Sequence, residues 1–498
     1  MTVSPFTASS TSSRPSGARA VMVCGTTSGA GKSFLTAALC RWYARQGLRV
    51  APFKSQNMSN NARVVAEGEM GSAQYFQALS ARAVPQVRMN PVLLKPERDD
   101  RSQVILLGRR DEALSSMDWR GRSERLWPPA REALHSLLRD HEVVVIEGAG
   151  SPAEINLHAN DIVNMRVARE AEAAVLLVSD IDRGGAFAHL FGTHQLLPPE
   201  ERALIRGYVL NKFRGDARLL APGPEMLQAL TGVPTVGVLP MWREHGLPEE
   251  DGVFDAAPLA SARAAGLSVV VVAYPRISNL DEFQPLKAVP SLQLRWARDP
   301  RTVAGADLLI LPGSKHVAED LRWLHSSGVG EAVRQHAQAD RPLLAICGGL
   351  QMLGTTLHDP DGVEGGGSGL GLWPLHTRYD VEKIQRRAQH RLQGASGHWA
   401  ALDGLPFEAY EIRHGRSTLE ALPGASPPPR AVLPDGAGWQ RGNTLALYTH
   451  GLFENTAVMH ALFGAHTPSL DDCFDGLADF LDRHMDTRFL ASLIADVA

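Results

Sequence analysis

A chain of 498 residues is longer than one hydrophobic core usually organises, so two or three domains are expected. Its apolar content of 44% and charged content of 21% are those of an ordinary globular protein, and a net charge of −4 gives no overall case for nucleic-acid binding. No apolar run approaches the roughly 18 residues needed to span a bilayer, which argues against an integral membrane protein. The four cysteines lack CxxC spacing, as expected of reduced thiols in a cytoplasmic protein.

Residues 1–20 are rich in Ser, Thr, Pro, Gly and Ala and contain no apolar core of the kind found in secretory signals. They also lack acidic residues and carry two arginines, which gives them a faint similarity to a transit peptide. Because so few of these side chains could be buried, we expect a disordered N-terminal tail over residues 1–20.

Residues 21–33, VMVCGTTSGAGKS, predict a strand that runs into a glycine-rich loop, and a helical pattern follows. This is the context of a phosphate-binding loop, in which backbone N–H groups and the helix N-terminus cradle the phosphates. Lys32 would neutralise phosphate charge and the Ser33 hydroxyl could ligate Mg²⁺. Gly25 and Gly31 enclose five residues instead of the usual four, and a chance glycine turn is the alternative. We expect a nucleotide site for ATP.

The next predicted strand, residues 48–53, leads into a loop at residues 54–61 that is dense in amide and hydroxyl groups. At the end of a strand beside a phosphate loop, such side chains line the ligand crevice of an open α/β sheet. An asparagine-rich turn without a binding role is the alternative. The candidate substrate residues in this loop are Lys54, Gln56 and Asn57, and two later stretches add Lys95 and Gln103 as weaker candidates.

The stretch HEVVVIEGAG, residues 141–150, predicts a fully buried parallel strand with Glu147 at its carboxyl end. Enzymes with a phosphate loop hold Mg²⁺ or a metal-bound water with a carboxylate at this place. A second buried strand ends at Asp180, with Asp182 just beyond it. Each of these acids could merely cap a helix, but two strands that bring acids to one sheet edge favour a ligand site.

Further strands are predicted before and after Asn211, and their alternation with helical patterns implies a parallel, doubly wound sheet. We place the first domain at residues 21–258 and a linker near residues 257–266. The second domain is placed at residues 266–462. Residues 467–498 form an amphipathic helical tail that we expect to pack on the second domain.

Residues 341–354, RPLLAICGGLQMLG, predict a strand, a sharp turn at Cys347 and a helix. This pattern is typical of a nucleophile elbow, where a helix N-terminus lowers the pKa of the thiol and backbone N–H groups hold an oxyanion. A buried structural cysteine is the alternative, but no packing role is evident for Gly348–Gly349. His450, at the end of another strand-like run, is the expected base, and His414 is a rival that looks more exposed.

Residues 362–371 and 382–391, which lie between the elbow and His414, are predicted to be surface loop. The second stretch, EKIQRRAQHR, is basic. We interpret it as a solvated face instead of a nucleic-acid site.

Taken together, these motifs resemble the cobyric acid synthase family, the glutamine-dependent amidotransferases of cobalamin biosynthesis. The resemblance extends from about Val21 to Asn455. It is carried by GTTSGAGKS, PFKSQNMSNN, MNPVLLKP, SQVILLGR, EGAGSPAEINL, SDIDRGG, NKFRGD, ICGGLQMLG, YEI and HGLFEN. The loop PFKSQNMSNN is the most specific of these, because the sister enzyme, cobyrinate a,c-diamide synthase, has a different sequence there.

The resemblance implies an α/β fold, with a P-loop domain similar to dethiobiotin synthetase followed by a domain similar to class I glutamine amidotransferases. It implies ATP- and glutamine-dependent amidation of four carboxylates of adenosylcobyrinic acid a,c-diamide through acyl phosphates. The expected partners are this corrinoid, glutamine and ATP with Mg²⁺, without nucleic acid or membrane; a homo-oligomer is left open.

The resemblance also implies residue roles. Cys347 would attack the glutamine carboxamide and form a thioester, with His450 as general base and acid. The oxyanion hole would come from Gly313, Ser314 and Gly348. Lys54 would offset charge at the reacting carboxylate, beside Gln56 and Asn57. Mg²⁺ would be held by Ser33 and Glu147. ATP would be held by Gly25, Thr26, Gly31, Lys32, Ser33 and Asn211, the last at the adenine-reading position.

Several positions depart from the family pattern. Gly29 stands where the family commonly has Asp, and Ala345 stands where it usually has Gly. Most class I domains have a Glu two residues after the catalytic histidine, but here that position is Leu452 and the nearest acid is Glu454. A Cys–His dyad, or an orienting acid from elsewhere, must therefore be allowed.

Two alternatives to this reading stay open. The first is cobyrinate a,c-diamide synthase or a related ligase. The second, from a different class, is a regulatory ATPase with a P-loop and a decayed amidotransferase domain.

Overall fold

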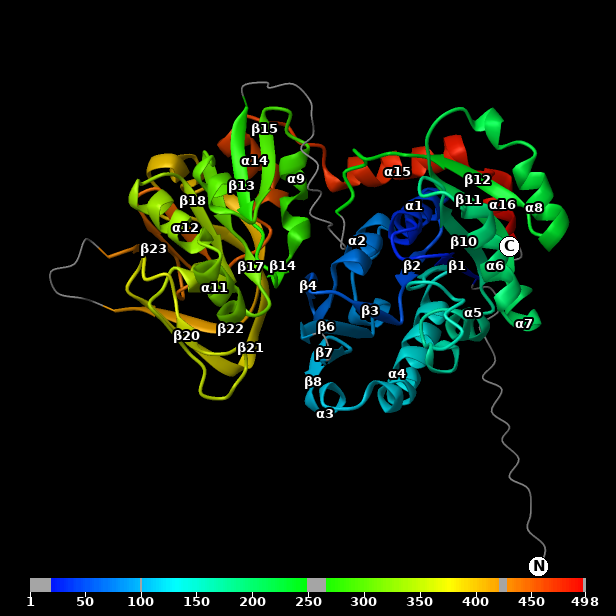
Figure 1. Cartoon of the computed structure of the whole chain (residues 1–498), viewed down its shortest axis with the longest axis horizontal. Coiled ribbons are helices and arrows are strands. Elements are labelled where there is room, and N and C mark those ends of the chain that lie inside the picture. The colour runs from blue at the N-terminus through cyan, green and yellow to red at the C-terminus, as the bar shows by residue number, and fades with distance from the viewer. Residues whose placement is uncertain (1–18, 99–100, 249–265, 421–427, 496–498) are drawn as a thin grey trace, which may run out of the picture.

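The computed structural model describes residues 19–98, 101–248, 266–420 and 428–495. Figure 1 shows two α/β lobes, each built around its own sheet. The predicted boundary at residue 258, residues 1–18 and most of the linker at 257–266 lie outside the described residues. The first strand begins at Arg19, two residues earlier than the sequence predicted.

The first lobe contains a six-stranded sheet whose neighbouring strands are all parallel. Its strands are apolar runs buried on both faces, which confirms the predicted doubly wound sheet. In spatial order they are β12 (Thr235–Pro240), β11 (Ile205–Phe213), β10 (Ala174–Asp180), β1 (Arg19–Gly25), β9 (Val143–Glu147) and β2 (Val50–Phe53). Since β1 lies between β9 and β10, the loops that follow these three strands are neighbours at one edge.

Helices cover this sheet and continue beyond it. The helices of the first lobe are α1 (Lys32–Arg45), α2 (Ser72–Ser80), α3 (Glu112–Ser115), α4 (Trp119–Asp140), α5 (Met165–Ala171), α6 (Ala186–Leu196), α7 (Pro199–Arg202) and α8 (Gly223–Thr231).

Two small sheets extend the first lobe toward the second. One contains β3 (Gln56–Met58), β6 (Val92–Arg98), β7 (Arg101–Leu106) and β8 (Arg109–Asp111), and the other pairs β4 (Ala62–Val65) with β5 (Gly68–Gly71). The prediction of an uninterrupted loop over residues 54–61 is therefore wrong. Gln56–Met58 forms a strand because its backbone pairs with β6 in parallel register.

The second lobe contains a seven-stranded sheet with a parallel centre and an antiparallel edge. In spatial order its strands are β15 (Leu292–Ala297), β13 (Leu267–Val272), β16 (Leu308–Leu311), β18 (Leu343–Ile346), β25 (Thr444–Leu447), β24 (Gly438–Arg441) and β23 (Arg430–Leu433). A short antiparallel pair joins β14 (Ile277–Ser278) to β17 (Gly313–Ser314). The helices are α9 (Gln284–Lys287), α10 (Pro300–Ala304), α11 (Val317–Ser326), α12 (Val329–Gln338), α13 (Gly348–Met352) and α14 (Thr456–Phe463).

A long hairpin extends from the second lobe and corrects one prediction. Residues 382–391, expected to be surface loop, lie in the 17-residue strand β21 (Leu375–Arg391), which pairs with β22 (Pro406–Leu419). Two short strands, β19 (Thr356–His358) and β20 (Gly367–Ser368), complete this sheet. The basic side chains are tolerated in the strand because Arg386 and Arg387 form ion pairs with Glu411 and Glu408 on β22.

The C-terminal helices α15 (Leu470–His484) and α16 (Thr487–Ser492) pack on the first lobe, so the prediction that they pack on the second is wrong. Figure 1 shows α15, near the C-terminus, packed beside α1, near the N-terminus. Leu477 is buried in the core of the first lobe. Polar contacts favour this partner, because Arg41 of α1 forms an ion pair with Asp471 of α15 and the Trp42 indole N–H donates a hydrogen bond to Asp482.

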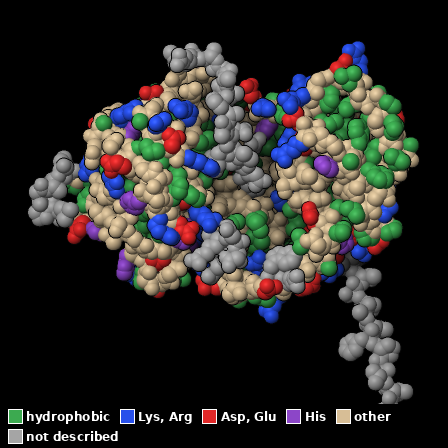
Figure 2. All heavy atoms as spheres, in the orientation of Figure 1, with side chains coloured by type: hydrophobic (Ala, Val, Ile, Leu, Met, Phe, Trp, Pro, Cys, Tyr) green, Lys and Arg blue, Asp and Glu red, His purple; other side chains and the backbone are tan. Residues whose placement is uncertain are grey.

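The surface of the molecule is hollowed between the two lobes in the view of Figure 2.

In the first lobe, α6 and α8 leave three large apolar side chains more than half exposed: Leu196, Met226 and Leu230. Among the described residues, no helix combines the length and the apolarity that a membrane span requires.

Candidate active sites

The glycine-rich loop leaves β1 and enters α1 through Gly31, whose φ of +99° favours glycine. A Cβ atom at Gly31 would lie 2.0 Å from the Asn211 side-chain nitrogen, so no other residue fits here. Asn211, on β11, donates a hydrogen bond to the Ala30 carbonyl at 2.9 Å. Thr26 is fixed by a 3.0 Å hydrogen bond to Ser179. The predicted ATP-binding residues therefore lie together around one loop.

Lys32 is folded back over this loop. Its ammonium group donates to the carbonyl oxygens of Thr27 at 3.1 Å and Gly150 at 3.2 Å. The positive charge therefore lies inside the curve of the glycine-rich loop, where a phosphate would be cradled.

Glu147 ends β9 and is buried against the start of α1. Its carboxylate accepts hydrogen bonds from Ser33 Oγ at 2.8 Å and Lys54 Nζ at 2.9 Å. Two side chains of α2, Gln74 and Gln77, donate to its other oxygen, and sequence reasoning missed both. Burial alone would raise the pKa of Glu147, but Lys54 and these hydrogen bonds hold it below its usual range. Glu147 is therefore an anion beside the Ser33 hydroxyl, and this pair of oxygen donors fits Mg²⁺.

The two acids that follow β10, Asp180 and Asp182, form ion pairs with basic side chains. Asp180 forms an ion pair with Lys212 at 3.2 Å, and Asp182 pairs with Arg214. Across the ranges that the structure describes, no three His, Cys, Asp or Glu side chains gather into a group that could hold a metal. An ion at this edge would therefore depend on Ser33, Glu147 and the phosphates of the nucleotide.

The predicted substrate residues separate into two places. Lys54 joins Glu147 at the nucleotide site, whereas Gln56 and Asn57 lie on β3, with Asn57 buried and Gln56 partly exposed. Lys95 and Gln103, the weaker candidates, lie on the β6–β7 hairpin and contact Glu69 and Lys315, respectively.

The second site is built at Cys347, between β18 and α13. Cys347 has φ of +50°, a strained value for a residue with a side chain, and its N–H donates to the Leu447 carbonyl at 2.8 Å. The expectation that Gly348–Gly349 has no packing role is wrong. A Cβ at Gly349 would lie 2.2 Å from the Leu311 carbonyl oxygen, and one at Gly348 would lie 2.7 Å from the Ser314 nitrogen. The glycines let the elbow approach these backbones, as a nucleophile elbow requires.

His450 follows β25 and lies beside Cys347, which contributes to the raised pKa of His450, so these two predicted residues are brought together. On the other side of the ring, His450 Nδ1 lies 3.0 Å from Glu282 Oε1. The second oxygen of Glu282 accepts from the Gly451 N–H at 3.1 Å. The site is therefore a Cys–His–Glu triad whose acid comes from the turn at Leu280–Phe283, far from the place where the family pattern has it.

The charge state of His450 follows from this arrangement. Burial alone would lower the pKa of His450, but the Glu282 carboxylate and the hydrogen bonds to Cys347 and Glu282 raise it to about 10. The imidazolium form is therefore favoured at neutral pH. Such a group can donate a proton to a leaving nitrogen.

The predicted oxyanion residues surround the same point. Gly313 lies against the histidine, since a Cβ there would be 2.9 Å from His450 Cε1. Ser314 and Gly348 are in mutual contact, and Ser314 Oγ donates to the buried Asp320. Burial raises the pKa of Asp320 to about 7.

The remaining candidates have other partners. His414 was expected to be more exposed, but it is buried, and its Nδ1 lies 3.0 Å from the Asp380 carbonyl. Burial lowers the pKa of His414 to about 3. Leu452 is buried in the core of the second lobe, and Glu454 forms an ion pair with Arg63 of the first lobe at 2.6 Å.

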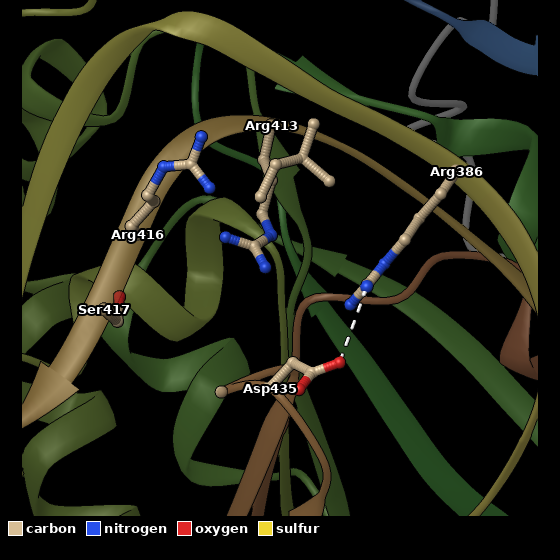
Figure 3. Close-up of a pocket in the computed structure, with 7 residues that line it drawn as sticks. Arg386, Arg413, Arg416, Ser417 and Asp435 are labelled. Atoms are coloured by element: carbon tan, nitrogen blue, oxygen red, sulfur yellow. Dashed lines mark ion pairs between the residues drawn. The ribbon is translucent and has the colours of Figure 1, made fainter.

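A cavity of about 230 Å³ lies between the β21–β22 hairpin and the turn before β24. Figure 3 shows the residues that line it. It is lined by Ile384, Arg386, Arg413, Arg416, Ser417, Asp435 and Gly436. Each of its three guanidinium groups contacts at least one carboxylate, and Arg386 faces Asp435 at 3.8 Å. Two of them, Arg386 and Arg413, share the buried Glu411.

Comparisons with known proteins give both halves of the chain a family. Residues 21–249 match a model described as a CobQ/CobB/MinD/ParA nucleotide binding domain. Residues 268–458 match a model described as a CobB/CobQ-like glutamine amidotransferase domain. Both matches agree with the two sites described above.

Two similar proteins, each matched over nearly its whole length, are named cobyric acid synthase. A cobyric acid synthase from Variovorax paradoxus (strain S110) is 62% identical over 96% of this chain and 99% of its own length. One from Methylibium petroleiphilum (strain ATCC BAA-1232 / LMG 22953 / PM1) is 62% identical over 96% of this chain and 97% of its own length. Among solved structures, a glutamine amidotransferase is 17% identical, covering 42% of this chain and 98% of its own, with a TM-score of 0.28.

Proposed function

The chain belongs to the cobyric acid synthase family, and on that premise we propose that it converts adenosylcobyrinic acid a,c-diamide to adenosylcobyric acid by amidating four peripheral carboxylates. Membership of the family makes the chain a glutamine-dependent ligase that uses ATP for amidation in cobalamin synthesis. The observation that carries the finer proposal is that one chain holds both the triad of Cys347, His450 and Glu282 and a phosphate loop beside Glu147.

The first half-reaction releases ammonia from glutamine. The Cys347 sulfur attacks the carboxamide carbon, and the resulting oxyanion is stabilised by the backbone around Gly313, Ser314 and Gly348. His450 then gives its proton to the nitrogen, the carbon–nitrogen bond breaks, and ammonia leaves a glutamyl thioester on the sulfur. Water, deprotonated by His450, hydrolyses the thioester to glutamate and restores the thiol.

The second half-reaction uses that ammonia. A carboxylate oxygen of the corrinoid attacks the γ-phosphorus of ATP, which gives an acyl phosphate and ADP. Ammonia then attacks the acyl carbon, phosphate leaves, and an amide remains. Activation is needed because a carboxylate is a poor electrophile, and local release of ammonia helps because its conjugate acid predominates in neutral water.

The residues of the first lobe would support this transfer electrostatically. Lys32 lies within the phosphate loop, and Lys54 lies beside Glu147, where it can offset the charge of a reacting carboxylate. Ser33 and Glu147 would hold Mg²⁺, which neutralises phosphate charge when bound. The roles of Gln56, Asn57 and Asn211 are proposed on the same basis.

The test is mass spectrometry of the corrinoid after incubation of the full-length protein with adenosylcobyrinic acid a,c-diamide, ATP and Mg²⁺. Wild type and Cys347→Ser are each supplied with glutamine or with ammonium. We expect four added amides from wild type with either nitrogen source. Cys347→Ser should add four amides with ammonium and none with glutamine.

Two outcomes would contradict the proposal. No amidation of adenosylcobyrinic acid a,c-diamide, with two amides added when cobyrinic acid is supplied in its place, would favour a,c-diamide synthesis. ATP hydrolysis without amidation from either nitrogen source would favour a regulatory ATPase.

A further inference from the structure

Arg63 belongs to the first lobe, on β4, but its guanidinium group is buried against the second lobe and the residue is 2% exposed. It forms ion pairs with two carboxylates of the second lobe, Asp281 and Glu454. The pair with Asp281 is buried on both sides. Arg63 is therefore an interior residue of the interface between the lobes.

Both carboxylates are next to the histidine of the triad. Asp281 directly precedes Glu282, whose two oxygens face His450 Nδ1 and the Gly451 N–H. Glu454 ends the turn Leu452–Glu454, which starts two residues after His450. One guanidinium group therefore joins the segment before the orienting acid to the segment after the histidine.

A third contact reaches the same histidine through an aromatic ring. The Tyr410 ring is stacked on the His450 ring, with centroids 5.3 Å apart, and the two backbones exchange hydrogen bonds of 2.8 and 3.2 Å. Arg63 Cζ lies 5.1 Å from the centroid of the same Tyr410 ring. Arg63 therefore contacts the face of Tyr410 as well as both acids.

The residues just before Arg63 hold the same turn of the second lobe. The side-chain oxygen of Asn61 accepts from the Leu280 N–H at 3.1 Å. The Ala62 N–H donates to the Asn279 side chain at 3.3 Å. Residues 61–63 of the first lobe thus form hydrogen bonds and an ion pair with residues 279–281, which directly precede Glu282.

Removing the guanidinium charge would leave Asp281 and Glu454 facing one another beside Glu282. Buried carboxylates without a cation are costly, so the two segments would move apart. This movement displaces Glu282 from His450. Displacements of about 1 Å at a catalytic group can cost about 100-fold in rate.

We propose that Arg63 is a positioning residue for the glutaminase triad, so that the P-loop lobe completes the active site of the amidotransferase lobe. This inference rests on the glutaminase half of the proposed function. Arg63 does not touch the reacting atoms; it acts through Asp281, Glu454 and Tyr410.

The experiment compares Arg63→Met, Arg63→Lys and Arg387→Met with wild type in the full-length protein. Arg387 is the matched control, because it crosses the same interface to contact Tyr75 and pairs with the exposed Glu408 instead of with Asp281 or Glu454. Glutamate release gives kcat and KM for glutamine. Amide formation with ammonium, counted by mass, reports the synthetase site separately.

We expect Arg63→Met to lower the kcat for glutamine hydrolysis by at least about tenfold with little change in KM. Arg63→Lys should recover part of the loss, and Arg387→Met should stay within about twofold of wild type. All three should amidate with ammonium at close to the wild-type rate. The iodoacetamide labelling rate of Cys347, followed by peptide mass against pH, should change in Arg63→Met alone.

The inference is overturned if Arg63→Met keeps a wild-type kcat, or if Arg387→Met loses as much. It is also overturned if Arg63→Met and Arg63→Lys both lose amidation with ammonium, because the residue would then serve the synthetase site or the fold. If wild type releases glutamate but forms no amide from either nitrogen source, the proposed function fails while the inference about Arg63 still stands or falls on glutamate release.

Discussion

His450 lies between a thiol and a carboxylate, and both neighbours favour its charged form. Glu282 is buried and accepts hydrogen bonds from His450 Nδ1 and the Gly451 N–H, which fixes its position relative to the ring. In the proposed reaction this makes the histidine a proton donor at the start. The carboxylate thus sets both the orientation and the protonation of the imidazole.

The substitution Glu282→Gln removes the charge and keeps the shape of the orienting group. Since Glu282 is the main cause that raises the pKa of His450 to about 10, this pKa should fall by about one unit or more. The alkaline limb of kcat/KM for glutamine hydrolysis should therefore move to lower pH. The measurement is glutamate release between pH 6 and pH 10.5.

Stability should depend on pH with a matching sign. Because the folded pKa of His450 is raised, its stabilising contribution is fully present below its ordinary pKa of 6.5 and is lost as the pH rises through about 10. The difference in unfolding free energy between wild type and Glu282→Gln should be larger at pH 6 than at pH 10. The exposed pair of Glu408 offers a control, because Glu408→Gln should move neither profile. An unchanged alkaline limb in Glu282→Gln would contradict this account.

Sequence reasoning found Cys347 and His450 because each follows a buried strand, and that pattern is visible locally. Glu282 was missed because it is 168 residues from His450 and lies on a short turn without a periodic signal. Gln74 and Gln77 were missed for a similar reason. They look like ordinary polar residues of a helix until the fold places them against Glu147.

At the level of secondary structure, the sequence predicted the central strands well. Strands such as Val143–Glu147 are unbroken apolar runs, as burial on both faces requires. The hairpin strand Leu375–Arg391 was missed because its second half is basic and only partly buried. Its stability comes from pairing with β22, and such cross-strand partners cannot be read from one segment.

The helix α15 was predicted from its apolar face, but its partner was not. Leu477 of α15 is fully buried in the core of the first lobe. Leu477→Ala should lower the unfolding free energy of that lobe by about 2–5 kcal/mol, because it removes buried methyl groups and leaves a cavity. The measurement is urea unfolding followed by hydrogen exchange of peptides from the first lobe, including the one with Trp42, which contacts Asp482 of the same helix.

The second lobe supplies the control for this prediction. Leu324 is equally buried in the other core, so Leu324→Ala should destabilise the second lobe instead. Glutamine hydrolysis at 20 °C should survive Leu477→Ala. A loss of stability confined to the second lobe in Leu477→Ala would contradict the packing described here.

For the whole molecule, the lobes meet through polar contacts as well as through Arg63. Glu69 of the first lobe lies between Lys95 of the same lobe and Lys383 of the second, with Lys383 Nζ at 2.8 Å. Nearby, Lys315, which follows Ser314 of the proposed oxyanion hole, contacts Gln103 at 3.2 Å. Sequence reasoning identified neither contact across the interface, because the partners are hundreds of residues apart and carry no shared local pattern.

The charges at this contact depend on one carboxylate. Burial alone would raise the pKa of Glu69, but Lys383 and Lys95 hold it well below its usual range. Burial lowers the pKa of Lys95 to about 7, and Glu69 opposes that change. Glu69 therefore stays ionised at neutral pH beside the two lysines of the interface.

Glu69→Gln should therefore separate the two half-reactions. Without the carboxylate, the pKa of Lys95 should fall further and Lys383 loses its ionic partner, so the lobes should fit less closely beside the oxyanion turn. Glutamine hydrolysis should persist, because the triad is built from the second lobe and braced by Arg63 at another point. Ammonia would then escape to solvent before it reaches the acyl phosphate.

The expected result is a lower ratio of amide formed to glutamate released, measured on the same sample. Glu408→Gln, at a more exposed ion pair of the second lobe, should keep the wild-type ratio. A wild-type ratio in Glu69→Gln would mean that ammonia crosses between the sites without help from this contact.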